Sequence, residues 1–266
     1  FLKPLDVELL IDFIRGDKPF ERKASGKQPG THHSERPTTQ HMHFGVLLGT
    51  STAMREIYRA IESVANTHAN VLIQGESGAG KELVAKAIHQ ASQVEGPFIA
   101  ANCGAFSREL IGSELFGHEK GAFTGAVSRK QGLFEQANGG TLFLDEITEM
   151  PIDLQPNLLR ALETKKVVRV GGREEIRIDC RVISATNRDP DEFAREDVLR
   201  EDLYYRLNVM RIRIPSLRDR LDDIPALTDF MLQRLQKDRR SRVGQVSEEA
   251  LQVMCQYNWP RNVRAL

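Results

Sequence analysis

The sequence predicts an α/β protein in which helices cover both faces of a parallel sheet and a small helical subdomain follows. Short apolar runs alternate with segments of helical periodicity, a pattern typical of a parallel sheet with both faces buried. After Pro215 the strand signals stop, and only two amphipathic helical segments remain, 224–235 and 247–256. The expected strands cover residues 71–73, 98–101, 141–144, 181–184 and 209–214. We therefore expect an α/β subdomain over 44–215 and a truncated helical lid over 216–266.

Composition excludes several classes of protein. Of the 266 residues, 40% are hydrophobic and 28% charged, which excludes a disordered or fibrous chain. The charges of the 37 basic and 37 acidic residues cancel, whereas a chain that coats nucleic acid has an excess of basic residues. Three widely spaced cysteines cannot form a disulfide framework and predict a reducing, cytoplasmic location. No apolar run approaches the roughly 18 residues of a membrane span, so no membrane partner is expected.

The first 43 residues lie outside the predicted α/β subdomain. Residues 1–15 are apolar and periodic, whereas 16–43 lose any period and are rich in Lys, Gly, Ser, Pro, Thr and His, as in a linker. The linker's histidines have no cysteine or carboxylate partner at ligand spacing, which favours a solvated tract over a metal site. They are His32, His33, His41 and His43. The missing initiator Met and the end at Arg264-Ala265-Leu266 predict a fragment of a longer chain.

The segment after the first predicted strand carries a phosphate-binding pattern. An amphipathic helix with Met54, Ile57, Ile61 and Val64 on one face comes first, and the 71–73 strand follows it. Next stands G-x-x-x-x-G-K before a helix predicted over 82–92, the context that a P-loop requires. Its glycines let backbone N–H groups converge on a phosphate, and its lysine supplies a positive charge. The alternative is a glycine-rich turn that binds nothing. The candidate nucleotide-binding residues are Gly75, Glu76, Ser77, Gly78, Ala79, Gly80, Lys81 and Glu82.

Two adjacent carboxylates end the 141–144 strand. Asp145 is predicted to hold Mg²⁺ through its water shell, and Glu146 to polarise the water that attacks the γ-phosphate. The alternative makes the pair a cap at a helix N-terminus. The P-loop upstream favours the catalytic interpretation, although Glu82 occupies the position where most P-loops offer a hydroxyl to the metal.

One further motif points to a family. The segment Gly121, Ala122, Phe123, Thr124, Gly125 and Ala126 reads GAFTGA and resembles the signature of the sigma-54-dependent transcriptional activators, also called bacterial enhancer-binding proteins. The resemblance extends from about Phe44 to Leu266. It implies an AAA+ P-loop ATPase that uses ATP and Mg²⁺, works as a hexameric or heptameric ring of identical subunits, and contacts the sigma-54 factor of RNA polymerase through the GAFTGA loop. The family typically also has Glu at the position of Glu82.

The resemblance implies roles for two asparagines that follow predicted strands. Asn102 corresponds to a switch residue that hydrogen-bonds the catalytic Glu146 according to nucleotide state. Asn187 corresponds to sensor I, which orients the attacking water or the γ-phosphate. Without the family pattern, either asparagine would be interpreted as ordinary turn chemistry.

The resemblance also implies roles for three arginines. Arg200 and Arg206 stand where the family has arginine fingers that reach the γ-phosphate of a neighbouring subunit, a task suited to a permanently charged planar group. On their own they would be interpreted as a solvated ion-paired surface. Arg264 matches the sensor II arginine of the lid, although Arg261 and Ala265 replace the usual Gly and Glu beside it.

The two ends of the chain suggest further domains. Residues 1–5 and the stretch after them resemble the end of a response-regulator receiver domain of a two-component system. The alternative is an unrelated helical leader. Family members usually end in a helix-turn-helix that binds enhancer DNA, and this sequence contains none, so only weak duplex binding is expected here. A nucleotide-dependent scaffold and a generic AAA+ machine remain alternatives. The intact Asp145-Glu146 pair argues against the scaffold, and the GAFTGA motif has no purpose in the generic machine.

Overall fold

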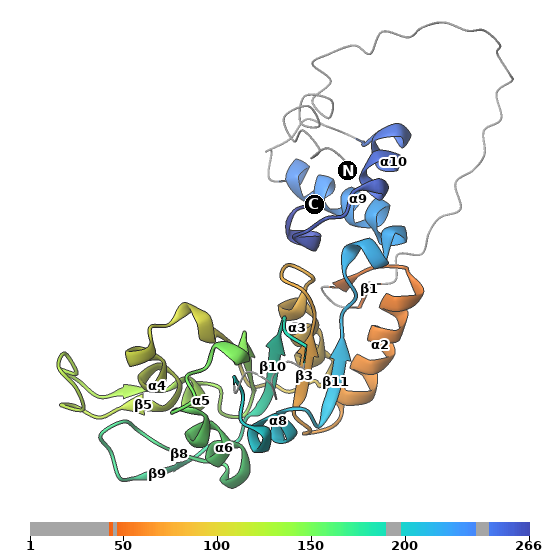
Figure 1. Cartoon of the computed structure of the whole chain (residues 1–266). Helices are drawn as coiled ribbons and strands as arrows, with labels where there is room; N and C mark the ends of the chain where they lie inside the picture. Colours follow the sequence, from red (N-terminus) through yellow and green to blue (C-terminus); the bar gives the residue numbers. More distant parts are fainter. Residues whose placement is uncertain (1–42, 45–46, 190–197, 238–244) are drawn as a thin grey trace, which may run out of the picture.

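The computed structural model describes residues 43–44, 47–189, 198–237 and 245–266 (Figure 1). The receiver-like stretch 1–15, the linker up to residue 42 and His32, His33 and His41 lie outside the described residues. Within the described ranges no helix is long and apolar enough to cross a membrane. The same ranges contain no group of three His, Cys, Asp or Glu side chains arranged to hold a metal by themselves.

A five-stranded parallel sheet forms the centre of the α/β subdomain. Its order is β11-β3-β10-β7-β4, so the P-loop strand β3 lies between β11 and β10. All five strands coincide with the predicted apolar runs, which confirms the fold class. Their bounds are β3 Val71–Gln74, β4 Phe98–Asn102, β7 Thr141–Asp145, β10 Arg181–Thr186 and β11 Met210–Arg213.

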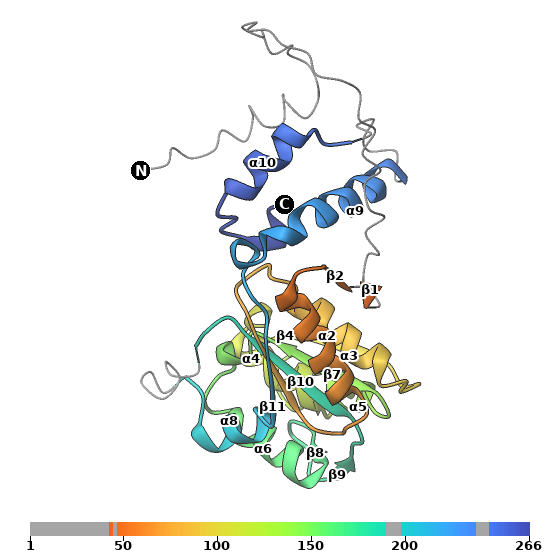
Figure 2. The same cartoon turned by 90° about the vertical axis from the view of Figure 1, so that its right-hand side faces the viewer.

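Helices cover both faces of this sheet because alternate strand side chains enter two separate cores. Ile73, Phe143 and Ile183 pack with α2 (Thr52–Ala65) and α3 (Lys81–Ala91) on one face. Figure 2 shows these two helices side by side over the sheet. Leu72 and Leu142 point to the opposite face. The helices of that face are α4 (Arg108–Phe116), α5 (Leu133–Gln136), α6 (Gln155–Thr164) and α8 (Glu201–Leu207).

Three short antiparallel strand pairs were not expected from the sequence. They are β1 (His43–Phe44) with β2 (Leu47–Leu48), β5 (Gly117–His118) with β6 (Lys130–Gln131), and β8 (Lys166–Val168) with β9 (Glu175–Arg177). Each strand has only two or three residues, too few for a period to show. The β5–β6 pair matters most for function, because the GAFTGA residues lie in the loop that it closes.

The lid lies beyond the carboxyl end of the sheet, where β11 leads into it (Figures 1 and 2). Two short turns, η3 (Leu217–Asp219) and η4 (Leu221–Asp223), precede α9 (Ile224–Lys237) and α10 (Glu248–Gln256), and η5 (Asn262–Arg264) ends the lid. A third core, which includes Leu217, Leu227 and Trp259, holds these elements together. Both predicted lid helices are confirmed within two residues at each end.

Candidate functional site

The loop between β3 and α3 has the backbone of an anion cradle. Gly78 and Gly80 adopt φ angles of 77° and 107°, in the left-handed region that glycine occupies without strain. A Cβ atom on Gly78 would also stand 2.2 Å from the carbonyl oxygen of Arg261. Helix α3 begins at Lys81, so its first N–H groups, which have no partner within the helix, face the loop.

Lys81 is buried at the base of this loop, with 8% of the residue exposed. Its Nζ donates to the carbonyl oxygens of Gly75 at 2.9 Å and Glu76 at 3.3 Å. Burial lowers the pKa of Lys81, while the charges of Asp145 and Glu146 act in the opposite direction. The ammonium therefore lies within the field of both carboxylates at the end of β7.

Asp145 and Glu146 lie where β7 ends, beside the end of β4. Asp145 is paired in register with Asn102, and its Oδ1 accepts a hydrogen bond from the backbone N–H of Glu146 at 3.0 Å. Glu146 adopts a left-handed φ of 51°, and its side chain makes no capping bond to the turn η2 (Ile147–Glu149) that follows. A non-glycine residue in that region is a strained backbone, a feature that concentrates at functional sites. The alternative that Asp145 and Glu146 cap a helix N-terminus therefore lacks support for Glu146.

These carboxylates suit Mg²⁺. A nucleotide-bound Mg²⁺ needs only one or two protein carboxylates, because phosphate oxygens and water complete its octahedral shell. Asp145 is half-buried at the strand end and offers the hard oxygen donors that this metal prefers.

Asn102 shares the end of the sheet with these carboxylates. Its Oδ1 accepts hydrogen bonds from the N–H groups of Gly104 at 2.8 Å and Ala105 at 3.1 Å, which is the turn chemistry that the alternative interpretation expects. A Cβ on Gly104 would lie 2.8 Å from Glu146 Oε2, so this turn packs against the Glu146 carboxylate. The structure brings Asn102 and Glu146 to the same place, and a switch contact between them stays a prediction.

Asn187 follows directly on β10 and is exposed. It lines the same cavity as Gly75 and Glu76 of the P-loop. The strand end before it is linked to the Asp145-Glu146 segment by a contact of 3.4 Å between the hydroxyls of Thr148 and Thr186. Asn187 therefore lies beside the P-loop, as the sensor I assignment requires.

Arg206 lies at the end of β3 opposite the P-loop of its own chain. The carbonyl of Arg206 accepts a hydrogen bond from Asn70 Nδ2 at 2.9 Å, and Asn70 precedes β3, whereas the P-loop follows it. Arg200 and Arg206 are both exposed, and Arg200 forms an ion pair with Asp202 at 2.8 Å. The ion pair agrees with the interpretation of these arginines as a solvated surface, whereas the placement of Arg206 directs it away from the P-loop of the same subunit.

The lid contacts the P-loop directly through residues that the sequence analysis did not single out. Asn262 is fully buried, and its Nδ2 donates to the Ser77 carbonyl and to Glu76 Oε2, both at 3.1 Å. Arg218 forms a two-pronged ion pair with Glu76. The pKa of Glu76 is lowered by the Arg218 hydrogen bonds and then by that of Asn262.

Arg264 stands over the same loop. A Cβ on Gly78 would lie 3.0 Å from Arg264 Cβ, and the charge of Arg264 contributes to lowering the pKa of Lys81. Arg261, one of the two departures from the family pattern, has a φ of −111° that any residue adopts, and it meets Gly78 through its carbonyl group. Arg261 is therefore compatible with this backbone, and Ala265 is exposed.

The GAFTGA residues form a compact turn within the loop closed by β5 and β6. The N–H of Gly121 donates to the Ala126 carbonyl at 2.8 Å, and that of Ala126 donates to the Phe123 carbonyl at 3.0 Å. Gly121 and Gly125 have φ angles of 82° and 103°. Phe123 is 38% exposed and packs edge-on against the His118 ring, with centroids 5.0 Å apart. Phe123 thus stays outside the three hydrophobic cores.

Comparison with protein families matches two regions of the chain. Residues 47–213 match the sigma-54 interaction domain, and residues 218–266 match the AAA+ ATPase lid domain. The chain belongs to the sigma-54 interaction domain family. The resemblance carried by the GAFTGA, P-loop and Asp145-Glu146 motifs is thereby confirmed, and so is a P-loop AAA+ domain followed by a helical lid.

Similar proteins include two bacterial regulators. The chain is 45% identical over 265 residues to the DNA-binding transcriptional regulator NtrC of Proteus hauseri, covering 99% of this chain and 54% of that protein. It is 42% identical over 266 residues to the regulatory protein AtoC of Escherichia coli K12, covering 100% and 57%. The crystal structure of NtrX from Brucella abortus in complex with ATP superposes with a TM-score of 0.76 at 38% identity, covering 82% of this chain and 48% of that one. The chain thus spans about half the length of the curated relatives that it matches.

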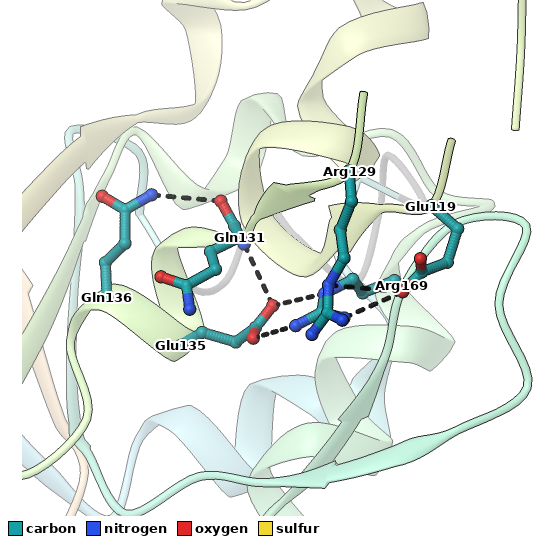
Figure 3. Close-up of polar contacts among 7 residues, drawn as sticks. Glu119, Arg129, Gln131, Glu135, Gln136 and Arg169 are labelled. Atoms are coloured by element: carbon teal, nitrogen blue, oxygen red, sulfur yellow. Dashed lines mark hydrogen bonds and ion pairs between the residues drawn. The ribbon is translucent and has the colours of Figure 1, made fainter. Parts of the chain in front are cut away.

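In this sigma-54 interaction domain, a buried arginine joins the GAFTGA loop to the β8–β9 hairpin (Figure 3). Arg169 follows β8, and its side chain is 3% exposed. Its guanidinium donates to Glu119 Oε1 at 2.8 Å, at the start of the loop, and to both carboxylate oxygens of Glu135 on α5. Arg129, at the other end of the loop, lies 3.8 Å from Glu119. Sequence patterns carry no signal for this cluster, because Arg169 lies 34 residues from Glu135 and 50 residues from Glu119.

The backbone reinforces this junction. Val170 donates to the Gly117 carbonyl at 2.9 Å and accepts from the Glu119 N–H at 3.0 Å, so the hairpin pairs with the strand that enters the loop. A Cβ on Gly171 would lie 2.7 Å from the Ala122 Cβ, within the GAFTGA motif itself. The hairpin that leads into β10 and Asn187 therefore packs directly against the GAFTGA loop.

Proposed function

We propose that this domain hydrolyses ATP within a ring of identical subunits and uses the GAFTGA loop to remodel RNA polymerase that carries the sigma-54 factor. The observation that carries the proposal is the physical connection between the P-loop site and the GAFTGA loop. Gly75, Glu76 and Asn187 line one cavity, and the hairpin before β10 holds the GAFTGA loop through Arg169. A change at the phosphates can reach the loop through elements in direct contact.

The chemistry assigned to the site follows from its residues. Lys81 would leave the loop carbonyls and bind phosphate oxygens, whose negative charge its ammonium group would neutralise. Glu146 would act as general base on the attacking water, and Asn187 would orient that water. Asp145 would hold Mg²⁺, which neutralises charge on the phosphate oxygens. Asn102 would alter the position of Glu146 with nucleotide state.

The ring follows from the position of the fingers. Arg200 and Arg206 are exposed, and the Asn70 contact places Arg206 at the end of β3 opposite the P-loop. A neighbouring subunit would therefore present them, and turnover would require assembly. A hexamer or heptamer is the ring that we expect from the family resemblance.

The partners extend the proposal beyond this domain. The tip around Phe123 would contact sigma-54, and its partial exposure makes it available for that contact. We propose a cytoplasmic location, consistent with the free cysteines Cys103, Cys180 and Cys255. Enhancer DNA would be bound by a C-terminal domain outside this sequence, and a two-component signal would enter through an N-terminal receiver domain.

Phosphate release measured across a range of protein concentrations tests the enzymatic part. Because the fingers act between subunits, specific activity should rise steeply with concentration and then saturate. Addition of sigma-54 with a transition-state analogue of ATP should give a stable complex. Specific activity independent of concentration would contradict the ring, and the absence of any ATP hydrolysis would contradict the proposal as a whole.

A further inference from the structure

Two side chains of the lid donate hydrogen bonds to carbonyl groups of the P-loop. Arg220, in the turn between β11 and α9, donates from Nη2 to the Ala79 carbonyl oxygen at 2.9 Å. Asn262, near the end of the lid, donates from Nδ2 to the Ser77 carbonyl oxygen at 3.1 Å. We call Arg220 and Asn262 the carbonyl clamp. Both are buried, with 4% and 0% of the residue exposed.

The clamp fixes the direction of two N–H groups. In a planar trans peptide the C=O of one residue points opposite to the N–H of the next, and the described chain contains no cis peptide. When the lid holds the carbonyls of Ser77 and Ala79, the N–H groups of Gly78 and Gly80 therefore point away from the lid side chains that hold them. Lys81 engages the carbonyls of Gly75 and Glu76 in the same loop. Successive N–H groups left free in this way form a concave anion site.

Each member of the clamp is anchored in the lid or at its base. Asn262 Oδ1 accepts from the Leu217 N–H at 2.7 Å. Arg220 belongs to the same turn as Asp223, whose fully buried carboxylate accepts from the N–H groups of Thr50 at 2.6 Å and Ser51 at 2.8 Å and from the Ser51 hydroxyl at 2.8 Å. Asp223 therefore fixes the base of the lid, and with it the turn that carries Arg220, to the start of α2.

We propose that Arg220 and Asn262 are positioning residues that preorganise the phosphate cradle by holding its carbonyl groups outward. The inference rests on the proposed function, because it concerns the nucleotide of the same site. The chemical group that the clamp serves is the diphosphate common to ATP and ADP. Loss of a clamp residue should therefore weaken both nucleotides by the same factor, unlike a contact made with the γ-phosphate.

The test measures dissociation constants of fluorescent ATP and ADP analogues for Arg220→Gln and Asn262→Ala. One variant removes a charge and the other does not, so a shared effect cannot come from net charge. Each should raise both constants about tenfold, the effect of losing a hydrogen bond to a preorganised site. Arg220→Lys keeps one donor for Ala79 and should recover part of the affinity. Arg234→Gln, which removes an exposed charge from the same lid, is the matched control and should bind as the parent does.

Melting temperatures without nucleotide identify variants that fail to fold, and if Arg220→Gln fails, Asn262→Ala decides alone. Unchanged constants in a folded variant would overturn the proposal. A loss confined to ATP would also overturn it, because it would place these contacts at the γ-phosphate. A parent chain that binds both nucleotides but neither hydrolyses ATP nor engages sigma-54 would refute the proposed function while leaving the clamp measurable.

Discussion

Lys81 and Glu146 lie at one site, and the proposed function gives them different parts of the reaction. Lys81 is a buried cation beside two carboxylates, and in the proposed function its interaction with phosphate oxygens would contribute to binding. Glu146 is an acceptor held in a strained backbone at the end of β7, where a bound water can be polarised. The two substitutions should therefore separate binding from chemistry.

Lys81→Ala should raise the dissociation constant for ATP at least about tenfold, because a charge-assisted contact with phosphate is lost. Glu146→Gln should bind ATP like the parent yet turn over about 10² to 10⁴ times more slowly, the range of general-base catalysis. Equilibrium titration and phosphate release measure the two effects. Glu163→Gln, an exposed carboxylate on α6, serves as the control with the same chemical change. Equal loss of ATP affinity in Lys81→Ala and Glu146→Gln would contradict the division of roles.

At the scale of elements, the β8–β9 hairpin supports the GAFTGA loop through a buried ion cluster. The Arg169 side chain is 3% exposed and that of Glu135 is 8% exposed, whereas Arg160 and Glu175, on α6 and β9, form a comparable pair that is 58% and 41% exposed. Hydrogen bonds from Arg169 hold the pKa of Glu119 below its usual value. The two pairs allow a matched comparison of a buried and an exposed arginine.

Arg169→Met should lower the free energy of unfolding by about 3 kcal/mol, because it leaves the buried Glu135 carboxylate without its cation. Arg160→Met should cost less than about 1 kcal/mol, as is usual for an exposed pair. Urea denaturation measures both variants. Arg169→Met should also make the 119–129 loop more susceptible to trypsin at Lys120 and Arg129. A similar small cost in free energy of unfolding for the two variants would show that the cluster does not hold the loop.

The elements also show what the sequence could and could not predict. The five core strands were predictable because each is an apolar run between turn residues. Asp145 and Glu146 could be placed at the end of a strand for the same reason. The strand pairs β5–β6 and β8–β9 were not predictable, since strands of two or three residues show no period. The contacts of Arg169 and Val170 that join the two pairs were not predictable either, because they connect residues distant in the sequence. Asn262 was missed as a P-loop contact because it lies 185 residues from Ser77 and meets it only when the lid folds back.

At the scale of the whole molecule, the proposed function requires a second subunit to complete the site. The lid, P-loop and strand ends surround the proposed phosphate position, but Arg206 lies at the opposite end of β3, and Arg200 and Arg206 are both exposed. A guanidinium supplied by a neighbour would complete the site, since charge spread over three phosphate oxygens suits a planar cation.

Arg200→Ala and Arg206→Ala should each reduce turnover by roughly 10³ to 10⁵, the contribution of an arginine finger, while ATP binding survives. Mixing Arg200→Ala subunits with Lys81→Ala subunits should restore part of the hydrolysis, because some interfaces then pair an intact P-loop with an intact finger. Phosphate release from the mixture, with mixed assembly verified, measures the recovery. If mixed rings form and no activity returns, the fingers act within their own subunit.

The central claim is that the loop transmits ATP hydrolysis to sigma-54 without taking part in it. The most direct measurement compares ATPase rate with nucleotide-dependent sigma-54 binding, on native gels with a transition-state analogue, for Phe123→Ala and Thr124→Ala. Phe230→Ala, an exposed phenylalanine on α9, is the control. The account predicts that both loop variants keep an ATPase rate within a few-fold of the parent and lose sigma-54 binding, whereas the control keeps both. Loop variants that lose stability and hydrolysis together, or that bind sigma-54 like the parent, would contradict it.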